Sequence, residues 1–425
     1  MIDISTLRDR PEVLRAALKR RGLDLDVESM VQIDRQRRET RVQAERTRAE
    51  QNTISRRISR LQGEQRQAAI AKAGKLAKQY RSALAAADRH DEEFRKLWIK
   101  VPNLAHPTAA DGLAEEDSLE FKRWGTVPEP GYPIKDHRQL GAALGMIDIE
   151  RAAKVSGTRF GYLTGPAVFI EFGLVRMALD FLGGKGFTPV VPPVLVREHA
   201  LYGTGFFPDD DQQVYEVGVD AGEGLRSDDL YLVGTSEVAL AAYHADEILE
   251  ENDLPLRYAG FSSCFRREAG AAGKDTAGIF RVHQFDKVEM FSFCHPDRSW
   301  DEHEFLLSLE EEIVRSLEIP YRVVNVAAGD LGSSAAKKYD IEAWVPSQGR
   351  YREITSCSNT TDFQSRRLRI RFRSESGNRL VHTLNGTAVA VGRILVALLE
   401  NHQQADGSFV VPEALRPYVG FERVG

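Results

Sequence analysis

The chain has 425 residues, about three times the usual size of a domain, so its length predicts two domains rather than one. Apolar residues make up 42% and charged residues 28% of the sequence, which is ordinary for a soluble globular protein. This composition excludes a disordered, collagen-like or disulfide-scaffold chain, and the formal net charge of −6 excludes a chain that is polybasic throughout.

The sequence also indicates a compartment. No run of 18 or more uncharged apolar residues occurs, and the first residues, MIDISTLRDRPEVL, lack the apolar stretch of a signal peptide, so we expect no membrane segment. The three cysteines, Cys264, Cys294 and Cys357, are far apart and form no C-x-x-C pair. This odd number of scattered thiols favours a reducing compartment, the cytoplasm, and gives no zinc-binding or disulfide pattern.

A basic segment extends from Val31 to Lys100. It carries 18 Lys and Arg against 9 Asp and Glu, a local charge of +9 that leaves −15 for the remainder of the chain. No proline occurs from Glu12 to Val101, so the segment is predicted to be helical almost throughout. A basic segment on an acidic body implies an anionic partner.

The apolar residues of this segment follow a sparse three-to-four spacing that forms one narrow stripe. The stripe contains Val42, Ala44, Ala49, Ile54, Ile58 and Leu61, and then Leu76, Tyr80, Ala83, Ala87, His90, Phe94, Leu97 and Val101. Such a seam predicts two antiparallel helices in a long hairpin that turns near Gly63 to Gly74. Because so few apolar residues cannot form a globular core, we expect an arm that projects into solvent.

The arginines of the arm allow two interpretations. Nine of them lie between Arg35 and Arg60, and charged helix faces often do no more than solvate a coiled coil. A local excess of this size equally fits a surface that follows a phosphate backbone.

The second domain follows a linker rich in proline and glycine that extends from Pro102 to Tyr132. Strands are predicted in the segments that begin at Gly186 (GFTPVVPPVLV), Leu230 (LYLVGTS), Arg257 (RYAGFSSCFRRE), Arg281 (RVHQFDKVEMFSF), Tyr321 (YRVVNVA) and Arg367 (RLRIRFR). Several carry charge on one face and apolar residues on the other, which favours a mostly antiparallel sheet in an α+β fold. No G-x-G-x-x-G opens a helix and no P-loop is present, so neither of these phosphate sites is supported.

The first of three polar clusters is a predicted β-hairpin that joins the run from Phe265 to Glu268 and the run from Ile279 to Phe285 through a loop of small residues. If both strands are unbroken, Arg266 and Glu268 share one face, as do Arg281, His283, Phe285 and Glu289, while Val282 offers only backbone groups. Arginines, a ring and carboxylates on one face suit a phosphate, a flat base and an ammonium or hydroxyl group. The alternative is a surface hairpin with Arg–Glu pairs, which contribute little.

The second cluster extends from Arg352 to Asn359 and contains Glu353, Thr355 and Ser356. Glu353 and Thr355 share a face of an extended segment. A carboxylate beside hydroxyl groups, near phosphate-binding arginines, fits Mg²⁺, which prefers oxygen ligands together with the phosphates of a substrate. The alternative is a turn of Ser, Thr and Asn that closes a strand.

The third cluster extends from His382 to Thr387 and leads into the segment from Ala388 to Leu399, in which only Arg393 is charged. An arginine in a buried apolar helix is costly without a partner, so Arg393 needs a fixed anionic or aromatic neighbour. That neighbour is either a structural ion-pair partner or a bound nucleotide.

Taken in order, these motifs resemble those of the seryl-tRNA synthetases, a family of class II aminoacyl-tRNA synthetases, over essentially the whole chain. The run from Phe265 to Phe285 is similar to motif 2 of that class, GFTPVVPPVLV with Pro193 to motif 1, and GTAVAVGRILVALLENHQ to motif 3. TSEV, HQFDKVEMF, YDIEAWVP and EITSCSNTTDFQSRR resemble the serine-specific signatures. The basic hairpin is similar to the arm with which this family binds its tRNA.

The resemblance implies a division into residues 1–108, a coiled-coil tRNA-binding hairpin, and residues 109–425, a class II catalytic domain whose mostly antiparallel sheet is flanked by helices. It implies catalytic roles for Arg266, Arg281 and Arg393. It implies ATP contacts for Arg266, Arg267, Glu268, Val282, Phe285, Glu353, Ile354, Thr355, Ser356 and Arg393, with Phe285 and Arg393 on either face of the adenine and Mg²⁺ held by Glu353 and Ser356. It implies serine contacts for Thr235, Ser236, Glu237, Arg266, Glu289, Asn385 and Thr387, and tRNA contacts for Arg46, Arg48, Arg56 and Arg57.

Two of these positions depart from the pattern of bacterial relatives, which usually have Ala in place of Ser236 and Ser in place of Thr387. Thr387 keeps the hydroxyl group and adds a methyl group to the serine pocket. The exact contact that this residue makes with serine is therefore left open.

The implied reaction is ATP-dependent activation of L-serine to seryl-adenylate, followed by transfer to the 3′-OH of tRNA(Ser). Mg²⁺ accompanies ATP, no zinc is expected, and we expect a homodimer. The resemblance leaves open whether tRNA(Sec) is also charged, and whether the arm serves its own subunit or the partner. Two rivals are a ligase that loads an amino acid onto a carrier protein, whose relatives lack the long basic arm, and a non-catalytic coiled-coil RNA-binding scaffold.

Overall fold

The computed structural model describes residues 1–208, 211–218, 230–269, 275 and 277–425. It divides into two compact units, one of Ile2–Pro102 and one of Met1 with Asn103–Gly425. The small-residue loop of the predicted hairpin falls largely on residues 270–274 and 276, which lie outside the described residues.

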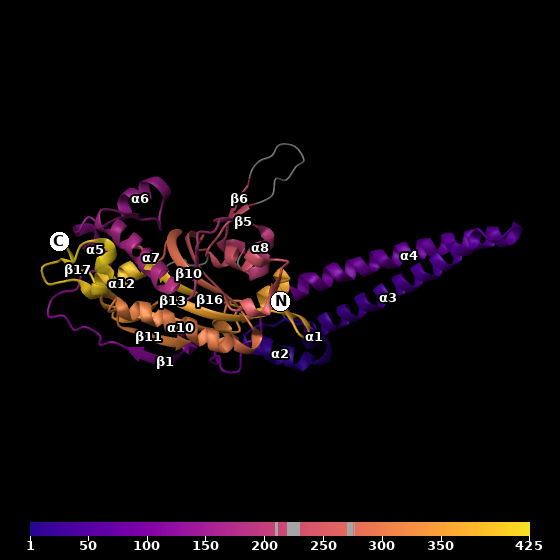
Figure 1. Ribbon diagram of the computed structural model, residues 1–425, viewed down its shortest axis with the longest axis horizontal. Helices are drawn as coiled ribbons and strands as arrows, with labels where there is room; N and C mark the ends of the chain where they lie inside the picture. Colours follow the sequence, from indigo (N-terminus) through magenta and orange to yellow (C-terminus); the bar gives the residue numbers. More distant parts are fainter. Residues whose placement is uncertain (209–210, 219–229, 270–274, 276) are drawn as a thin grey trace. The chain divides into compact units, whose positions relative to one another are not determined.

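The first unit is helical, as predicted. Two short helices, α1 (Ser5–Asp9) and α2 (Pro11–Arg20), precede two long ones, α3 (Val27–Ile58) and α4 (Gly63–Trp98), which run side by side in opposite directions (Figure 1). Asp26 caps α3, because its side chain accepts the Ser29 N–H at 2.9 Å. The predicted antiparallel hairpin is confirmed.

The turn of the hairpin differs from the prediction. It occupies residues 59–62, and Gly74 lies inside α4. Gly63 begins α4 with a φ of +54°, a value that glycine adopts without strain. The alanines and lysines around Gly74 are strong helix formers, so a single glycine does not end the helix there.

The seam between α3 and α4 is narrower than predicted. Ala44, Leu76 and Ala87 are buried in it, whereas Val42 is 44% exposed and Ala49 is also exposed. Those two positions of the predicted stripe were therefore wrong. With so little apolar area between the helices, much of the arm's surface is polar and open to solvent.

The arm displays the arginines that the sequence singled out. Arg46, Arg48, Arg56 and Arg57 are exposed. The Arg48 guanidinium lies 5.6 Å from the centroid of the Tyr80 ring on α4. Nearer the base of the arm, the arginines are engaged by carboxylates, as shown by Asp34, which pairs with Arg8, Arg37 and Arg38.

The second unit is built on one eight-stranded sheet. In spatial order its strands are β1 (Leu119–Trp124), β11 (Tyr321–Asn325), β12 (Lys337–Val345), β13 (Arg350–Thr361), β16 (His382–Ala390), β10 (Gln284–Cys294), β9 (Leu256–Phe265) and β4 (Thr188–Val190). Every neighbouring pair is antiparallel except β4 and β9, which are parallel. The predicted α+β fold with a mostly antiparallel sheet is confirmed.

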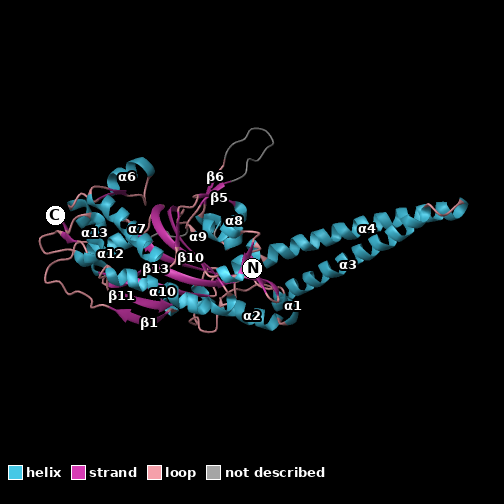
Figure 2. Cartoon of the chain, viewed as in Figure 1, coloured by secondary structure: helices cyan, strands magenta, loops and turns pink. Residues whose placement is uncertain are grey.

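Three long helices pack against this sheet. They are α7 (Pro166–Gly184), α10 (Ser299–Ser316) and α12 (Val391–His402), and Figure 2 shows them beside the strands. Met290 and Ile341 of the sheet share one apolar core with Leu306, Ile313 and Leu395 of these helices. Burial of such side chains is the main stabilising contribution to the fold.

Smaller elements surround the sheet. They are the helices α5 (His137–Ala143), α6 (Ile149–Ser156), α8 (Glu198–Thr204), α9 (Glu237–Ala241), α11 (Phe363–Leu368) and α13 (Arg416–Val419), and the strands β2 (Ile147–Asp148), β3 (Tyr162–Leu163), β5 (Leu195–Arg197), β6 (Tyr215–Val217), β7 (Leu230–Leu232), β8 (Ile248–Glu250), β14 (Arg371–Ser374), β15 (Gly377–Leu380), β17 (Phe409–Val410) and β18 (Arg423–Val424).

Two predicted strands need correction. The segment from Gly186 divides into β4 and β5, because Pro192 and Pro193 have no N–H for a sheet. The segment from Arg367 does not begin as a strand, because Arg367 and Leu368 end helix α11, where Phe363 and Leu368 are buried. Only its end, β14, is extended.

Candidate active site

A cavity of about 260 Å³ in the second unit is lined by residues from all three polar clusters. Its walls come from the ends of the β9–β10 hairpin, from β13 and β16, and from the first turn of α12. The predicted residues that line it are Thr235, Glu237, Arg266, Glu268, Arg281, Val282, Phe285, Glu289, Glu353, Ile354, Thr355, Ser356, Asn385, Thr387 and Arg393. Segments up to about 160 residues apart in the chain thus meet in one place, because β10, β16 and β13 are neighbours in the sheet.

The hairpin is not the pair of unbroken strands that alternation assumed. β9 ends at Phe265 and β10 begins at Gln284, and Glu268 adopts a φ of +50°. The pairing still continues one step further, because the Arg266 N–H donates to the His283 carbonyl at 2.9 Å.

The turn of the backbone at Glu268 brings its carboxylate to Arg281, where Nη1 donates to Oε2 at 2.7 Å. His283 was predicted to share a face with Arg281 and Phe285, but it does not line the cavity. Its Nδ1 lies 2.9 Å from the Arg266 carbonyl, and its ring lies between Phe160 and Tyr215.

Arg266 comes directly after the end of β9, beside the start of β10. Its Nε donates to the Gly234 carbonyl at 3.2 Å, and its guanidinium carbon lies 5.2 Å from the centroid of the Phe285 ring. One bond to a neutral carbonyl and one stacked ring leave the positive charge of Arg266 without a carboxylate partner in these contacts. A guanidinium held in place by a neutral carbonyl and an aromatic ring suits an anionic ligand.

Arg393 has both of the neighbours that its sequence context required. Its Nη1 lies 3.1 Å from Oε1 of Glu353 and 3.1 Å from the Glu353 carbonyl, and its guanidinium carbon lies 5.2 Å from the centroid of the Phe280 ring. The ion-pair partner is therefore present in the protein itself.

Glu353 is ionised at neutral pH. Its side chain is 43% exposed. Partial burial favours the neutral acid, but the charges of Arg393, Lys338 and Arg266 outweigh that effect and lower the pKa of Glu353 to about 2.

A second group of carboxylates lies deeper, around Glu289. Its Oε2 accepts hydrogen bonds from the hydroxyl groups of Thr235, at 3.3 Å, and Thr387, at 3.5 Å, and also contacts the Lys287 ammonium. All four side chains are buried. Phe285, Lys287 and Glu289 are every second residue along β10, so their side chains lie on the same face of the strand and point into the cavity.

Glu237 is the neighbour of this group. Its Oε1 accepts a hydrogen bond from Nε2 of Gln364 at 2.8 Å. Burial, together with the negative charge of Glu289, raises the pKa of Glu237 to about 7. The pocket thus holds a carboxylic acid that titrates near neutral pH and gains a charge when a cation approaches.

Two predicted contact residues do not line the cavity. Ser236 is fully buried, and its hydroxyl donates to the Gly260 carbonyl at 3.2 Å. Arg267 is exposed, and its backbone N–H donates to the Gln213 carbonyl at 2.9 Å.

Thr355 lines the cavity, but its hydroxyl donates to the buried Glu310 of α10 at 3.0 Å. A register shift between Ile341 and Glu342 in the β12–β13 pairing interrupts the alternation that placed Glu353 and Thr355 on one face.

Charged and aromatic cavity residues that were not among the predicted site residues include Lys287, Lys338 and Phe280. Lys287 carried a signal, because it lies between Phe285 and Glu289 on the same face of a strand. Lys338 lies on β12, a strand that was not predicted. Phe280 carried no signal in the sequence, because only the fold places its ring against both Arg352, at 4.1 Å, and Arg393.

Among the described residues, no group of three or more His, Cys, Asp and Glu side chains is arranged to hold a metal ion. The three cysteines are buried free thiols. In the described ranges, no helix combines the length and the apolar character needed to cross a bilayer.

Comparison with known proteins identifies the family. Residues 1–105 match the seryl-tRNA synthetase N-terminal domain, and residues 221–402 match the tRNA synthetase class II core domain (G, H, P, S and T). A serine–tRNA ligase of Acidothermus cellulolyticus is 52% identical over 421 residues, which cover 99% of this chain and 98% of the relative. The chain belongs to the seryl-tRNA synthetase family.

Solved structures of seryl-tRNA synthetases agree with this assignment. The crystal structure of the Pyrococcus horikoshii enzyme complexed with ATP has a TM-score of 0.91 and 42% sequence identity, and the match covers 100% of this chain and 99% of that one. The cytoplasmic Naegleria fowleri enzyme in complex with AMP has a TM-score of 0.87 and 33% identity, over 100% and 98% of the two chains. The predicted activity, serine–tRNA ligation by a class II aminoacyl-tRNA synthetase, is confirmed.

Proposed function

We propose that the cavity joins L-serine to AMP from ATP and then passes the seryl group to the 3′-OH of tRNA(Ser). One observation carries this proposal: guanidinium groups, an aromatic ring and a buried acidic pocket converge on a single cavity. The serine carboxylate attacks the α-phosphate, and pyrophosphate leaves. The protein positions the reactants and neutralises charge, and it supplies no nucleophile.

The phosphate end of the cavity is assigned to the arginines. Arg266 bonds to a neutral carbonyl, Arg281 is paired with Glu268 and Asp275, and Arg393 is paired with Glu353. The phosphates of ATP would take the place of those carboxylates or bind beside them. The positive charges of Arg281 and Arg393 would therefore stay neutralised after binding. Phe285 and Arg393 would flank the adenine, and Val282 would offer its backbone groups.

Mg²⁺ fits the residues present. Glu353 is ionised and Ser356 offers a hydroxyl oxygen, and two protein ligands are as many as Mg²⁺ needs when phosphates and water complete its octahedral shell. When bound, the ion would neutralise phosphate charge. Arg266 and Arg393 would orient the phosphates beside it.

The serine end is assigned to the buried acidic group. Glu237 and Glu289 would accept hydrogen bonds from the ammonium and hydroxyl groups of serine, and Thr235, Asn385 and Thr387 would complete the pocket. A pocket that must hydrogen-bond a hydroxyl group rejects alanine and glycine strongly, because its polar groups would be left unpaired. The methyl group of Thr387 would oppose the larger threonine.

The pH dependence of serine binding follows from Glu237. A carboxylate binds an ammonium group, whereas the neutral acid does not, so the KM for serine is expected to fall about tenfold as the pH rises from about 6 to 8 through the pKa of about 7. The measurement is pyrophosphate exchange at saturating ATP across that range. In Glu237→Gln the KM for serine should be higher and flat across the same range. A wild-type KM that does not change with pH would exclude Glu237 as the titrating group.

The arm is assigned to tRNA. Arg46, Arg48, Arg56 and Arg57 are exposed on its first helix, where they can meet phosphates. Replacing all four by glutamine should weaken tRNA binding and reduce the slope of log K against log salt by about 0.7–0.9 for each phosphate that is no longer neutralised. Replacing Arg35 and Arg38 near the base of α3 is the control. An unaltered slope in the fourfold variant would assign tRNA to another surface.

A homodimer and the cytoplasm complete the proposal. Phe169 and Phe172 of α7 are each 61% exposed, and Val191 of motif 1 is 80% exposed, so these residues offer apolar surface that a second copy would bury. Sedimentation should give twice the chain mass of 47.6 kDa. Three free thiols suit a reducing compartment.

The experiment that tests the proposed function is serine- and ATP-dependent pyrophosphate exchange by the purified protein, followed by charging of tRNA(Ser). Exchange without charging of any tRNA would favour a carrier-protein ligase. Absence of exchange, with RNA binding retained, would favour the scaffold.

A further inference from the structure

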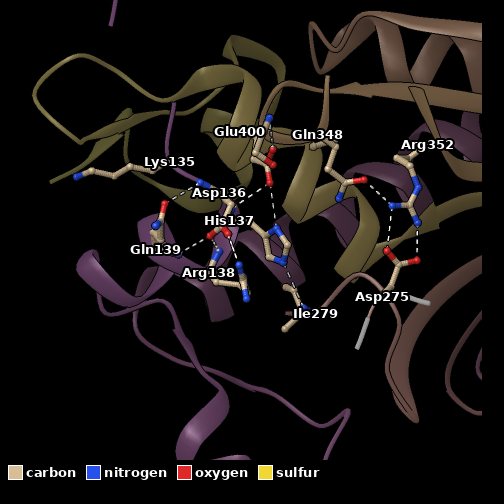
Figure 3. A network of polar contacts seen from close by, with 12 residues as sticks. Lys135, Asp136, His137, Arg138, Gln139, Asp275, Ile279, Gln348, Arg352 and Glu400 are labelled. Atoms are coloured by element: carbon tan, nitrogen blue, oxygen red, sulfur yellow. Dashed lines mark hydrogen bonds and ion pairs between the residues drawn. The ribbon is translucent and has the colours of Figure 1, made fainter. Parts of the chain in front are cut away.

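The wall of the cavity formed by Ile279, Phe280 and Arg281 is held from outside by a buried histidine. His137 begins helix α5, and its ring is turned toward this segment (Figure 3). Its Nε2 lies 3.4 Å from the backbone nitrogen of Ile279, a group that can only donate, so Nε2 is the acceptor. The ring proton is therefore on Nδ1.

The other side of the ring is held by a carboxylate. Nδ1 of His137 lies 3.0 Å from Oε1 of Glu400 at the end of α12, and the His137 backbone N–H donates to the same oxygen at 3.0 Å. Oε2 of Glu400 accepts the Ser347 N–H at 3.1 Å. His137 and Glu400 are both buried. Burial favours the neutral acid of Glu400, but these hydrogen bonds outweigh it and hold its pKa below the usual value.

Gly278 shows how closely the histidine approaches. A Cβ at this position would lie 2.1 Å from Nε2 of His137, and the φ of Gly278 is +89°. Only glycine permits this backbone and this contact. The backbone at Gly278 therefore lies against the imidazole ring, directly before Ile279, where the chain begins to line the cavity.

A second pair of contacts reaches the same segment. Arg352 donates to Asp275 at 3.0 and 2.5 Å and to Gln348 at 2.6 Å, and its guanidinium carbon lies 4.1 Å from the centroid of the Phe280 ring. Figure 3 shows the hydrogen bonds of both groups, those of His137 with Glu400 and Ile279 and those of Arg352 with Asp275 and Gln348. Of the two, the histidine contact acts on the backbone directly beside Phe280 and Arg281.

We propose that His137, oriented by Glu400, is a positioning residue that fixes the Ile279–Arg281 wall for ATP. This inference rests on the proposed assignment of that wall to the nucleotide. His137 does not line the cavity, so it acts only through Ile279. Its loss should therefore weaken ATP binding and leave the binding of serine, at Glu237 and Glu289, unaffected.

The test uses three replacements of His137 in the full chain. Glutamine places an acceptor near the former Nε2 and can still reach Ile279. Asparagine reproduces the position of Nδ1 and can reach only Glu400. Phenylalanine keeps the ring volume and has neither polar atom. The matched control is His402→Phe, which removes a half-buried histidine that bonds to a backbone group, the Leu317 carbonyl at 2.9 Å, away from the cavity.

The expected result is a rise of roughly three- to tenfold in the Kd and KM for ATP in the asparagine and phenylalanine variants, with the glutamine variant near wild type. The KM for serine should be unchanged in all of them, and His402→Phe should change neither constant. The Kd is measured by calorimetry with ATP alone and the KM by pyrophosphate exchange.

An ATP affinity that is equal in the wild type and in the asparagine and phenylalanine variants would overturn the proposal. So would an equal loss in the asparagine and glutamine variants, or a parallel rise in the KM for serine, since a purely structural histidine would give those results. If the wild type shows no serine-dependent exchange, the proposed function fails, while the Kd series with ATP still decides the role of His137.

Discussion

Arg266→Ala is expected to lower serine-dependent pyrophosphate exchange by about a hundred- to a thousandfold, the loss typical when one preorganised donor to a developing charge is removed. Arg266 lines the cavity and is held by a neutral group, the Gly234 carbonyl, and by the Phe285 ring, so its guanidinium is placed to bind the α-phosphate in the proposed reaction. The effect should appear mainly in kcat, measured at saturating ATP and serine.

Arg267→Ala is the matched control for this prediction. Its side chain is next in the sequence, carries the same charge and lies outside the cavity, so exchange should remain within a few-fold of wild type. If Arg266→Ala retains wild-type exchange, or if both variants lose it equally, the α-phosphate is held elsewhere. Arg266→Lys should recover only part of the activity, because lysine lacks the planar fork of arginine.

Removing the arm, residues 31–100, and closing the gap with a short glycine–serine linker should leave pyrophosphate exchange nearly unchanged and lower tRNA charging by about a hundredfold or more. The catalytic unit has its own apolar core, which includes Leu306, Ile313 and Leu395, so it keeps its cavity without the arm. The deleted segment carries a charge of +9, and tRNA binding weakens with every phosphate that the shortened protein leaves unneutralised.

The two assays on the armless protein separate the possible failures. Loss of both activities, together with a lower melting temperature, would mean that the linker damages the catalytic unit, and a second linker length then repeats the test. Full charging of tRNA(Ser) at limiting tRNA would refute the role assigned to the arm. Charging that is restored by high tRNA concentration would support it, since the arm then contributes affinity alone.

The sequence predicted the arm and the hairpin well, for simple physical reasons. A long stretch without proline and with a narrow apolar seam has few alternatives to paired helices, and alternation marks strands such as β10, where Phe285 and Glu289 share a face. The prediction that His283 shares a face with Arg281 and Phe285 was wrong, because it assumed an unbroken strand. The positive φ of Glu268 and the start of β10 at Gln284 send His283 away from the cavity.

Strand β13 shows a different limit. Its residues from Thr355 to Thr361 are mostly hydroxyl and amide side chains, which in isolation are typical of a turn. In the fold these groups are satisfied by distant partners: Thr360 bonds to Thr383, and Asn359 bonds to the Ser299 carbonyl. Local pattern does not contain those partners, so the full length of the strand and the convergence of Lys338 and Phe280 on the cavity could not be predicted.

The buried carboxylate of Glu237 makes the stability of the folded protein depend on pH. Burial and the negative charge of Glu289 raise the pKa of Glu237 to about 7, so the folded protein loses stability as the pH rises from the ordinary pKa of a glutamate toward about 7. If serine places its ammonium group here, as we propose, it binds the folded protein alone and should raise the melting temperature by mass action.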